Sequence, residues 1–567
     1  MSPLHREDRR QPAAPAGDLR RIDPVATPPD AALVLDFDPL EALRLGVLPW
    51  RRIAGQTVVL CSRLDRFREV QARLEVRLGP CRPALAQPHA IERALHLVAG
   101  PALAHRAETL APSEASCRNL SGARIRAAGT LALTGTGTAL ALAPLATAQV
   151  LTALTLALLL AWTALRASAL ALSFLPQKPT ADGNVVMATF PRITLLVPLF
   201  HERDIADHLL ARLAALRYPR DRLQVLLILE DNDRQTRAVL DRTDLPHWMT
   251  PVTVPEGRIR TKPRALNFAL PLATGDIIGI YDAEDAPAPD QLLQVATRFA
   301  CRLRKVACLQ GRLDFFNPRA TWMTRCFALD YAAWFRVILP ALSRLGLPLP
   351  LGGTTLFLRR DVLEEVGGWD AHNVTEDADL GLRLYRHGYR TELIDSVTEE
   401  EANGRPLPWI RQRSRWQKGY AVTWLVHMRR PGALWRDLGP AGFAFVQVLL
   451  LGTLIQAAAA PILWLFALSG AGLIPAAALP AGNGALVLAL ALLACEGIGW
   501  LTAWRGAALA GKSRLALWLP ALIPYFALAT VSVAKAIGEL VWSPFYWDKT
   551  AHGVLAIPPL PPSGHRA

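Results

Sequence analysis

The chain alternates between segments with a soluble pattern and long segments in which nearly every position is apolar. Residues 129–175 are apolar apart from Arg166, their single charged residue, and are interrupted by glycines and Pro144. Because a helix needs about 20 apolar residues to cross a bilayer, this segment predicts two membrane helices with a turn near Pro144. A second apolar region, 440–541, predicts three more, at 442–469, 485–504 and 515–534.

Between these two regions, residues 190–431 alternate short apolar runs with helical patterns. Buried strands are predicted at 193–197, 226–229 and 277–281, and helices at 205–216 and 265–272. Polar residues follow each strand directly, and ligands of open α/β sheets bind at the carboxyl ends of strands. The pattern therefore predicts a doubly wound, Rossmann-like α/β domain, placed between the membrane helices, with a ligand site at one sheet edge.

The N-terminal region has a different pattern. Residues 1–30 show no periodicity and are predicted to be disordered. Residues 31–100 predict a small α/β module, which resembles the N-terminal domain of type II secretion ATPases. Some of those domains bind cyclic di-GMP, but the arginine and leucine repeats that would carry nucleotide binding are not evident here. We therefore expect a module that docks a protein partner. Its predicted elements are strands at 47–50 and 57–60 and helices at 64–78 and 89–98.

Composition supports a membrane protein. Hydrophobic residues make up 51% of the chain and charged residues only 19%, below the usual quarter of a soluble protein. The net charge of +14 comes without any zinc-finger, RNP or basic-zipper pattern, so no nucleic-acid partner is expected. The seven cysteines are scattered singly and indicate neither a zinc site nor disulfides. No apolar signal-peptide core is present near the start.

The positions of the charges predict an orientation. Basic residues flank the apolar segments, whereas the loop 470–483 carries no charge. Since cytoplasmic loops are enriched in Lys and Arg, the N-terminal region and residues 176–440 are predicted to be cytoplasmic. We expect a multi-pass protein of a bacterial-type inner membrane, in contact with membrane lipids and ending in a tail, 542–567. The flanking basic residues are Arg124, Arg126, Lys178, Arg505, Lys512 and Arg514.

Candidate chemistry is concentrated in residues 374–420. The triplet Thr375-Glu376-Asp377 precedes an amphipathic helix at 380–385, and Gln412-x-x-Arg415-Trp416 lies among cations before the chain becomes apolar. An acidic triplet, Asp282-x-Glu284, follows the third strand. In this order the motifs resemble those of the membrane-embedded, processive family 2 glycosyltransferases, which include cellulose synthase and hyaluronan synthase. The resemblance covers 191–431 and implies a GT-A fold.

The resemblance implies roles for the carboxylates. Asp282 would bind Mg²⁺ or Mn²⁺ that bridges the donor diphosphate, since carboxylate oxygens suit these cations. This chain has Glu where the family usually has the second Asp, so either Glu284 or Asp285 could complete the metal site. Asp377 matches the general base of an inverting transfer. A lone T-E-D triplet is usually a helix N-terminus, and its order among the other motifs favours the catalytic role.

The remaining matches concern the donor and the acceptor. Segments after the first two strands match the places that hold uracil and ribose, and 262–267 resembles the K-A-G-x-L-N segment without its glycine. The Gln-x-x-Arg-Trp pentad would lie under the acceptor and the diphosphate, while a basic interfacial helix contacting anionic lipid is the rival interpretation. Residues expected to bind the donor are Pro198, Glu202, Asp231, Lys262, Asn267, Asp282, Gln412, Arg415 and Trp416.

The sequence thus predicts an inverting glycosyltransferase that moves a sugar from a nucleotide-diphosphate sugar, expected to be a UDP-sugar. The acceptor would be a growing polysaccharide at the cytoplasmic face, with transfer coupled to export. Five spans are few for a complete export channel. Transfer of a single sugar to a lipid or membrane-bound acceptor is therefore the first alternative. An inactive scaffold for a polysaccharide or secretion assembly is the second.

Overall fold

The computed structural model of the protein consists of two compact units. The first unit comprises Met1–His105 together with Pro255–Gly257, and the second comprises Arg106–Val254 and Arg258–Ala567. Several sequence predictions concern residues outside the described ranges: the tail 1–20, Lys178, most of the loop 470–483, and the C-terminal tail beyond Tyr546. The structure describes residues 21–176, 189–202, 206–470, 472–473, 483–543 and 546.

The first unit is a three-stranded sheet with helices. Strands β1 (Val47–Ile53) and β2 (Gln56–Cys61) are antiparallel, and β3 (Cys81–Leu85) lies parallel to β2. The predicted helix at 64–78 is α3 (Leu64–Leu78). β3 was not predicted because it is short and contains a proline. Two short helices, α1 (Ala31–Phe37) and α2 (Pro39–Leu45), also lie in this unit. Its core contains Val34, Phe37, Leu48, Leu60 and Leu74.

Helix α4 (Pro88–Thr109) begins in the first unit and ends in the second. Residues 110–121 then lead to α5 (Gly122–Leu142) and α6 (Pro144–Phe174), with Pro144 as the first residue of α6. Proline is favoured there, because the first helical N–H has no partner within the helix. By length and apolar composition α6 can span a membrane. α5 is not apolar enough to count as a candidate span, because Gly, Thr and Arg lower its average hydropathy.

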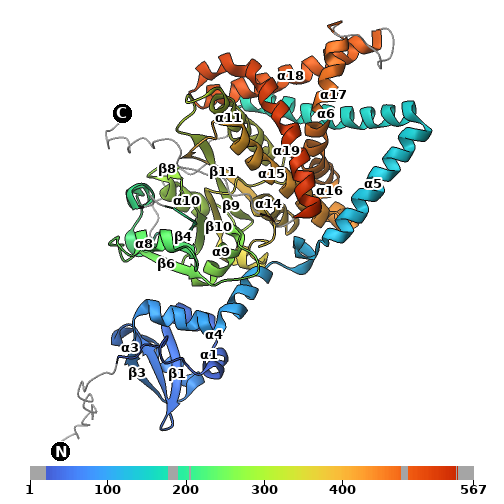
Figure 1. The fold of residues 1–567 in the computed structure, drawn as a ribbon. Coiled ribbons are helices and arrows are strands. Elements are labelled where there is room, and N and C mark those ends of the chain that lie inside the picture. Colours follow the sequence, from blue (N-terminus) through green and yellow to red (C-terminus); the bar gives the residue numbers. More distant parts are fainter. Residues whose placement is uncertain are drawn as a thin grey trace, which may run out of the picture. The chain divides into compact units, whose positions relative to one another are not determined.

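The second unit is built on a mixed eight-stranded sheet (Figure 1). Its strand order is β6-β5-β4-β7-β10-β9-β11-β8, and the first four are parallel, as in the predicted doubly wound arrangement. β10 is antiparallel to both of its neighbours, so the sheet is mixed rather than purely parallel. The strands are β4 (Ile193–Leu199), β5 (Leu223–Glu230), β6 (Met249–Val254), β7 (Ile277–Ile280), β8 (Ala286–Pro287), β9 (Val306–Phe315), β10 (Leu356–Arg359) and β11 (Arg390–Glu400).

The helices around this sheet form where apolar side chains recur at helical spacing. In α10 (Gln291–Ala300), for example, Leu292, Val295 and Phe299 are buried in the sheet core. Two of the helices carry the sequence motifs: α14 (Glu376–Arg386) holds the T-E-D carboxylates and α15 (Pro406–His427) holds the Gln-x-x-Arg-Trp pentad. The others are α7 (Ala211–Ala215), α8 (Arg234–Leu240), α9 (Lys262–Ala269), α11 (Trp322–Ala333), α12 (Leu339–Arg344) and α13 (Arg360–Glu365).

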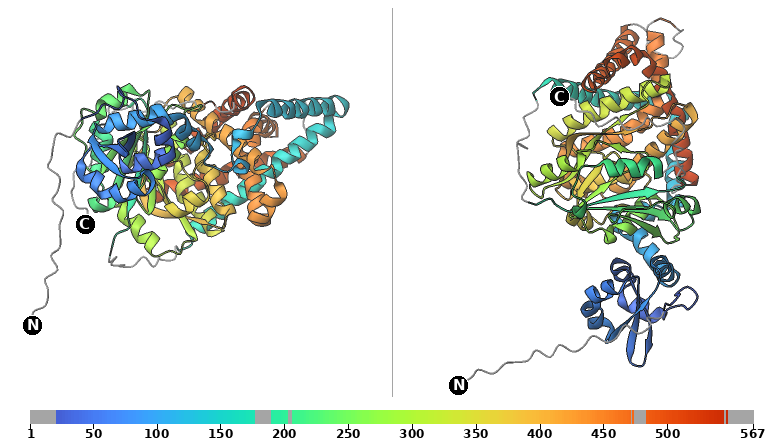
Figure 2. Two further views of the ribbon diagram at one scale, coloured as in Figure 1. Left: turned by 90° about the horizontal axis from the view of Figure 1, so that it is seen from below. Right: turned by 90° about the vertical axis from the view of Figure 1, so that its left-hand side faces the viewer.

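Long apolar helices follow the sheet and pack beside it (Figures 1 and 2). They are α16 (Pro431–Val446), α17 (Thr453–Gly470), α18 (Asn483–Leu509) and α19 (Leu522–Trp542). Pro431–Ser469, Leu486–Leu509 and Ser513–Trp542 are each long and apolar enough to span a membrane. Trp322–Arg344 is also long and apolar enough, but 67% of its apolar stretch is buried inside the protein. Such burial is expected of a helix packed inside protein rather than one facing lipid.

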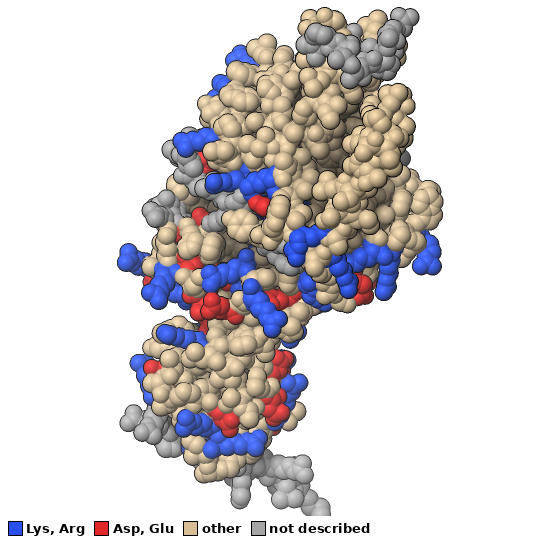
Figure 3. Space-filling model, turned by 45° about the vertical axis from the view of Figure 1, so that its right-hand side comes forward, with Lys and Arg blue, Asp and Glu red and all other residues tan. Residues whose placement is uncertain are grey.

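The surface also separates charged from apolar regions. On the face drawn in Figure 3, the upper part carries few charged side chains, and Lys and Arg gather in a band beneath it. Several leucines of α6 and α18 are exposed, among them Leu154, Leu160, Leu490 and Leu493. Exposed apolar helices beside a basic band are the distribution expected of a protein embedded in a bilayer.

Reporter fusions test the topology and the role of α5. If both α5 and α6 cross, reporters at the N-terminus and at Lys178 will both be cytoplasmic, and one at Asn483 will be external. Arg126 of α5 donates to the carbonyl of Val541 in α19 (3.3 Å), which keeps α5 beside a membrane helix. A reporter at the N-terminus on the opposite side from one at Lys178 would show that α5 does not cross.

Candidate active site

Most of the sequence motifs meet in one cavity of the second unit, with a volume of about 830 Å³. The carboxyl ends of β4, β5 and β7 deliver residues to it, as a parallel sheet predicts. The segment before α9, the turn at 351–354, the start of α14 and one face of α15 complete the polar part. The predicted site residues that line the cavity are Pro198, Glu202, Lys262, Asp282, Glu284, Asp377, Gln412, Arg415 and Trp416.

Lys262 connects the donor-side residues. Its Nζ forms an ion pair with Asp282 and donates a hydrogen bond to the carbonyl of Gly353 (2.8 Å). Burial favours the neutral amine, but Asp282 and Glu376 outweigh it and raise the pKa of Lys262. The ammonium group is therefore charged at physiological pH. It can neutralise a phosphate that enters beside Asp282.

The carboxylates after β7 have different surroundings. Asp282 and Glu284 line the cavity, whereas Asp285 is fully buried behind them. One oxygen of Asp285 accepts from the backbone N–H of Asp282 (2.8 Å) and from the Thr354 hydroxyl. Burial and the charges of Asp282 and Glu284 raise the pKa of Asp285 well above its usual range. Of the two alternatives for a second metal ligand, the geometry thus brings Glu284 rather than Asp285 to the cavity.

Among the described residues, no group of three or more His, Cys, Asp or Glu side chains could hold a metal ion by itself. Asp282 and Glu284 can offer two carboxylates. In addition, within the described parts of the chain, Asp285 Oδ1 and Glu400 Oε1 are buried without a hydrogen-bond partner. The two cavity carboxylates, Asp282 and Glu284, fit a hard cation that takes its remaining oxygens from a phosphate group.

Asp377 lies in the first turn of α14, where the helix dipole favours a carboxylate. Its Oδ1 accepts from the backbone N–H of Ala378 (2.8 Å). Burial raises the pKa of Asp377 to about 6, against the lowering effects of that N–H, Lys262 and Arg415. A carboxylate with this pKa is ionised at neutral pH yet basic enough to accept a proton from a hydroxyl group.

Glu376 is a cavity residue that the sequence interpretation passed over. It is buried beside Asp377, and burial together with the Asp377 charge raises its pKa to about 8. Glu230, the last residue of β5, also lines the cavity and forms an ion pair with the buried Arg264. The sequence shows an acidic run at the end of that strand, but no pattern in it indicates that Glu230 rather than Asp231 lies in the cavity.

The position of α14 is set by a buried network. Asp379 is ion-paired with Arg383 (2.8 Å) and hydrogen-bonded to the His427 ring of α15 (3.0 Å). Arg383 also donates to the carbonyls of Val366 (2.8 Å) and Gly368 (2.7 Å). Asp379 is fully buried and does not lie in solvent. It instead joins α14 to α15 and so holds the base-bearing helix against the pentad.

The pentad lies on α15 with its side chains in separate roles. The Gln412 amide oxygen accepts from Asn403 (2.9 Å). Arg413 is ion-paired with Asp330 and lies 4.6 Å from the Trp416 ring centroid, so it is engaged within the protein and not a contact for lipid. Arg415 and Trp416 line the cavity.

Three predicted residues do not line the cavity. Asp231 is exposed, and its backbone N–H continues the strand pairing to Val254 (3.1 Å). Asn267 is buried and binds backbone groups of Ala107 and Trp369. The third is Asp285, described above. In the structure Asn267 therefore fixes the chain and is not placed to contact a donor.

The cavity continues from these polar groups among the long apolar helices. Leu159 and Trp162 of α6, Trp464 of α17 and Trp500 of α18 line this part. Two ionisable residues in candidate membrane helices, Arg166 and Glu496, line it as well. The sequence pattern had marked Arg166 only as an interruption of an apolar run. An ionisable residue at membrane depth usually faces a cavity or a partner.

Comparison with known proteins adds the family. Residues 277–531 match the family model described as "Glycosyl transferase family group 2". The chain contains a family 2 glycosyltransferase domain. The match begins at β7 and includes Asp282, Asp377 and the pentad, whereas Lys262 and the segments before it lie outside.

Two of the curated relatives have names that give different acceptors. A beta-monoglucosyldiacylglycerol synthase from Synechocystis sp. (strain ATCC 27184 / PCC 6803 / Kazusa) is 30% identical over 281 residues, covering 48% of this chain and 57% of that protein. A probable glucomannan 4-beta-mannosyltransferase 6 from Oryza sativa subsp. japonica is 25% identical over 271 residues, covering 45% and 47%. The chain spans about half the length of the curated relatives it matches.

Among solved structures, a mannosyltransferase from Pyrobaculum calidifontis in complex with GDP-Man and Mn²⁺ is similar over 70% of this chain and 98% of that chain. The sequence identity is 22% and the TM-score 0.44.

The raised pKa of Asp377 predicts a pH dependence. If Asp377 must be ionised to act, kcat/KM for the donor will fall by about tenfold per pH unit below an apparent pKa of about 6 and level off above it. The measurement is the pH profile of initial rates. Circular dichroism over the same range controls for unfolding. An acid limb near pH 4, the ordinary value for Asp, would contradict the buried base.

Proposed function

We propose that the protein is an inverting hexosyltransferase of the cytoplasmic membrane with a GT-A-like catalytic domain. It would transfer a sugar from a nucleotide-diphosphate sugar to an acceptor that reaches the cavity from the membrane helices. One observation carries this proposal: Lys262, Asp282, Asp377 and Arg415 line a single cavity that continues among long apolar helices. The family match and both kinds of relative support it.

The donor side would work by neutralising charge. Lys262 and Arg415 would bind the diphosphate, whose negative charge grows as the sugar departs. Asp282 and Glu284 would hold a Mg²⁺ or Mn²⁺ ion, and that ion would supply further charge stabilisation to the leaving group. Glu230 and Arg260 line the cavity at the end of β5 and before α9, and they would contact the nucleoside.

The acceptor side would supply the base. Asp377 would accept the proton of the acceptor hydroxyl as its oxygen attacks the sugar carbon from the side opposite the diphosphate. The turn containing Gly353 lies against Asp377, and a Cβ atom at this position would be 3.0 Å from the carboxylate. The absence of a side chain there leaves room for an acceptor beside the base.

We consider two kinds of acceptor, a growing glycan and a lipid, and the names of the relatives include both. A growing glycan would use Trp416 as a platform, because an indole face packs well on a sugar ring. A lipid acceptor would place its chains against the apolar part of the cavity, and the lining residues Leu159, Leu463 and Leu492 favour this candidate. A panel of radiolabelled nucleotide sugars, incubated with purified membranes and followed by sizing of the product, decides between them.

Metal and base should be separable by mutation. Asp282→Ala is expected to abolish metal-dependent donor binding, since no bound cation then shields the negative charge of the diphosphate. Asp377→Asn is expected to keep donor binding and to lower turnover by at least about 100-fold, as for the loss of a general base. Binding is measured by titration and turnover by sugar release. Asp377→Asn with more than about a tenth of the wild-type rate would remove Asp377 from its role.

Trp416 distinguishes a polymerase from a single-transfer enzyme. In a polymerase, Trp416→Ala should shorten the products, because the glycan loses an aromatic contact of about 0.5–1.5 kcal/mol beyond its buried area. Hydrolysis of the donor, in which water accepts the sugar, should persist, because the residues proposed to bind the donor are intact. Arg415→Ala should depress both reactions. Product length on a gel beside donor consumption gives the readout, and a wild type that adds only one sugar would favour the lipid or membrane-bound acceptor.

A further inference from the structure

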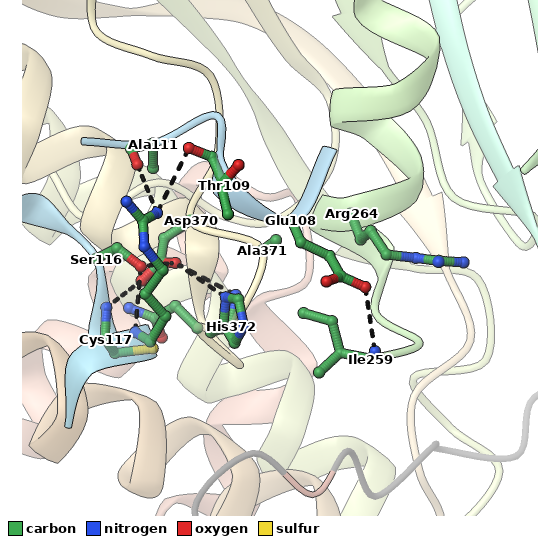
Figure 4. Close-up of polar contacts among 12 residues, drawn as sticks. Glu108, Thr109, Ala111, Ser116, Cys117, Ile259, Arg264, Asp370, Ala371 and His372 are labelled. Carbon is green, nitrogen blue, oxygen red and sulfur yellow. Dashed lines mark hydrogen bonds and ion pairs between the residues drawn. The ribbon is translucent and has the colours of Figure 1, made fainter. Parts of the chain in front are cut away.

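A segment outside the family match is bound into the catalytic domain by buried polar contacts. This segment, residues 107–118, is called the strap below. At its start Glu108 is only 5% exposed, and one of its carboxylate oxygens accepts from the backbone N–H of Arg258 (2.7 Å). The same oxygen accepts from the backbone N–H of Ile259 (3.3 Å), the contact drawn in Figure 4. Arg258 and Ile259 stand directly before Arg260, Thr261 and Lys262, which line the cavity.

The other end of the strap contacts the segment that leads to the base. Asp370 is fully buried, and its two oxygens accept from the Ser116 hydroxyl (2.7 Å) and from the backbone N–H of Cys117 (2.7 Å) (Figure 4). The chain continues from Asp370 to Val374, where it joins the cavity wall and then enters α14 with Asp377.

Between these ends the strap is closely packed. The Asn267 side chain donates to the carbonyls of Ala107 (2.9 Å) and Trp369 (2.8 Å), so it connects the strap to both segments. Gly367 and Gly368 have positive φ angles and lie under the strap. A Cβ atom on either glycine would come within 2.7 Å of Pro112 or Leu110. The two glycines are therefore required for this approach as well as for their turn.

The strap also reaches the helix that carries the pentad. Arg429, just beyond the end of α15, donates to the carbonyl of Ser116 (3.0 Å). Cys117 packs against Val422 and Val426 on the same helix. The strap thus contacts the three parts of the chain that bring Lys262, Asp377 and Arg415 to the cavity.

We propose that the strap positions the donor-binding lysine and the catalytic base relative to each other, with Glu108 and Asp370 as positioning residues. The inference rests on the proposed function, because it takes Lys262 as a ligand of the diphosphate and Asp377 as the base. The Thr261 hydroxyl donates to the carbonyl of Ala371 (2.6 Å), so the two segments held by the strap are also connected to each other. Displacing reacting groups by 1 Å can lower a rate by about 100-fold.

The two ends predict different kinetic effects. Glu108→Ala should chiefly weaken donor binding and raise the donor KM by about tenfold, since the amides before Lys262 lose their charged acceptor. Glu108→Gln keeps an acceptor oxygen and should restore most of the affinity. Ser116→Ala removes a donor from buried Asp370 and should lower kcat by about tenfold at nearly unchanged donor KM. Glu114→Ala removes an exposed carboxylate of the same strap and is the matched control.

The experiment uses the full chain in nanodiscs, with UDP-glucose and GDP-mannose as donors. Binding of UDP and GDP with Mn²⁺ is measured by calorimetry, thermal unfolding of each variant is followed in parallel, and rates are normalised to folded protein. A raised donor KM in Glu108→Ala and a lowered kcat in Ser116→Ala, with Glu114→Ala like the wild type, support the strap. If Glu108→Ala does not fold, Glu108→Gln replaces it: a donor KM raised by clearly less than tenfold supports the strap, and a wild-type donor KM counts against it.

Other outcomes overturn the inference. Variants that unfold earlier but keep wild-type KM and kcat would show that the strap only stabilises the fold. Equal losses of donor affinity and of kcat in the Glu108 and Ser116 variants would show that the strap does not position the lysine and the base separately. A wild type that binds and transfers neither sugar nucleotide would remove the proposed function for these donors, and the strap's role in it. An active wild type with unchanged variants would remove the strap alone.

Discussion

The ion pair between Lys262 and Asp282 lies in the polar part of the cavity, and much of the site depends on it. Lys262 stands at the start of α9 and Asp282 just past β7, and the same ammonium group donates to Gly353 beside the base. The cavity also contains the acidic side chains of Glu284, Glu376, Asp377 and Glu400. Without Lys262 these carboxylates would repel one another in a buried site, and more of them would be protonated.

A second constraint joins this edge to the membrane helices. α15 carries the pentad, packs through His427 against Asp379 of α14, and lies along α19. Lys418 of α15 is fully buried, and its ammonium group binds Glu539 of α19 (2.8 Å). Lys535 of α19 also pairs with Glu539, so this cluster joins two residues of α19 to one of α15. Through it, a shift of α19 would be transmitted to the helix that bears Arg415.

Periodicity predicted much of this architecture. The strands at 193–197, 226–229 and 277–281 lie inside β4, β5 and β7, apart from the last residue of the third, because buried parallel strands are continuous apolar runs with polar residues at their ends. β10 and the order β10-β9-β11 could not be predicted, since antiparallel insertion depends on pairing between segments far apart in sequence. The helix pair α11–α12 was missed as an apolar segment because it lies within the soluble pattern and is buried by tertiary contacts.

The site was predicted where a motif is local and missed where it is assembled in space. Asp377 and Arg415 lie in compact patterns, and both line the cavity. Asn267 fits the family segment by sequence, yet the turn of α9 directs it toward Trp369 and the strap. Glu230 and Asp231 are neighbours on a strand end, and alternation of side chains places only one of them in the cavity. No pattern in one sequence could indicate that Glu108 contacts a loop 150 residues away.

The charges of the cavity also constrain how a donor can enter. A nucleotide diphosphate is an anion, and Asp282, Glu284 and Glu400 face the space beside Lys262. Lys262 is already paired with Asp282, which leaves Arg260 and Arg415 to offset both these acidic groups and a diphosphate. Coulomb repulsion at short range in a partly buried site is several times larger than in water. The balance would be completed by positive charge that the donor brings with it, or by protons that the carboxylates take up. Carboxylates that repel a bare diphosphate but attract its complex with a cation would admit the donor only in its chelated form.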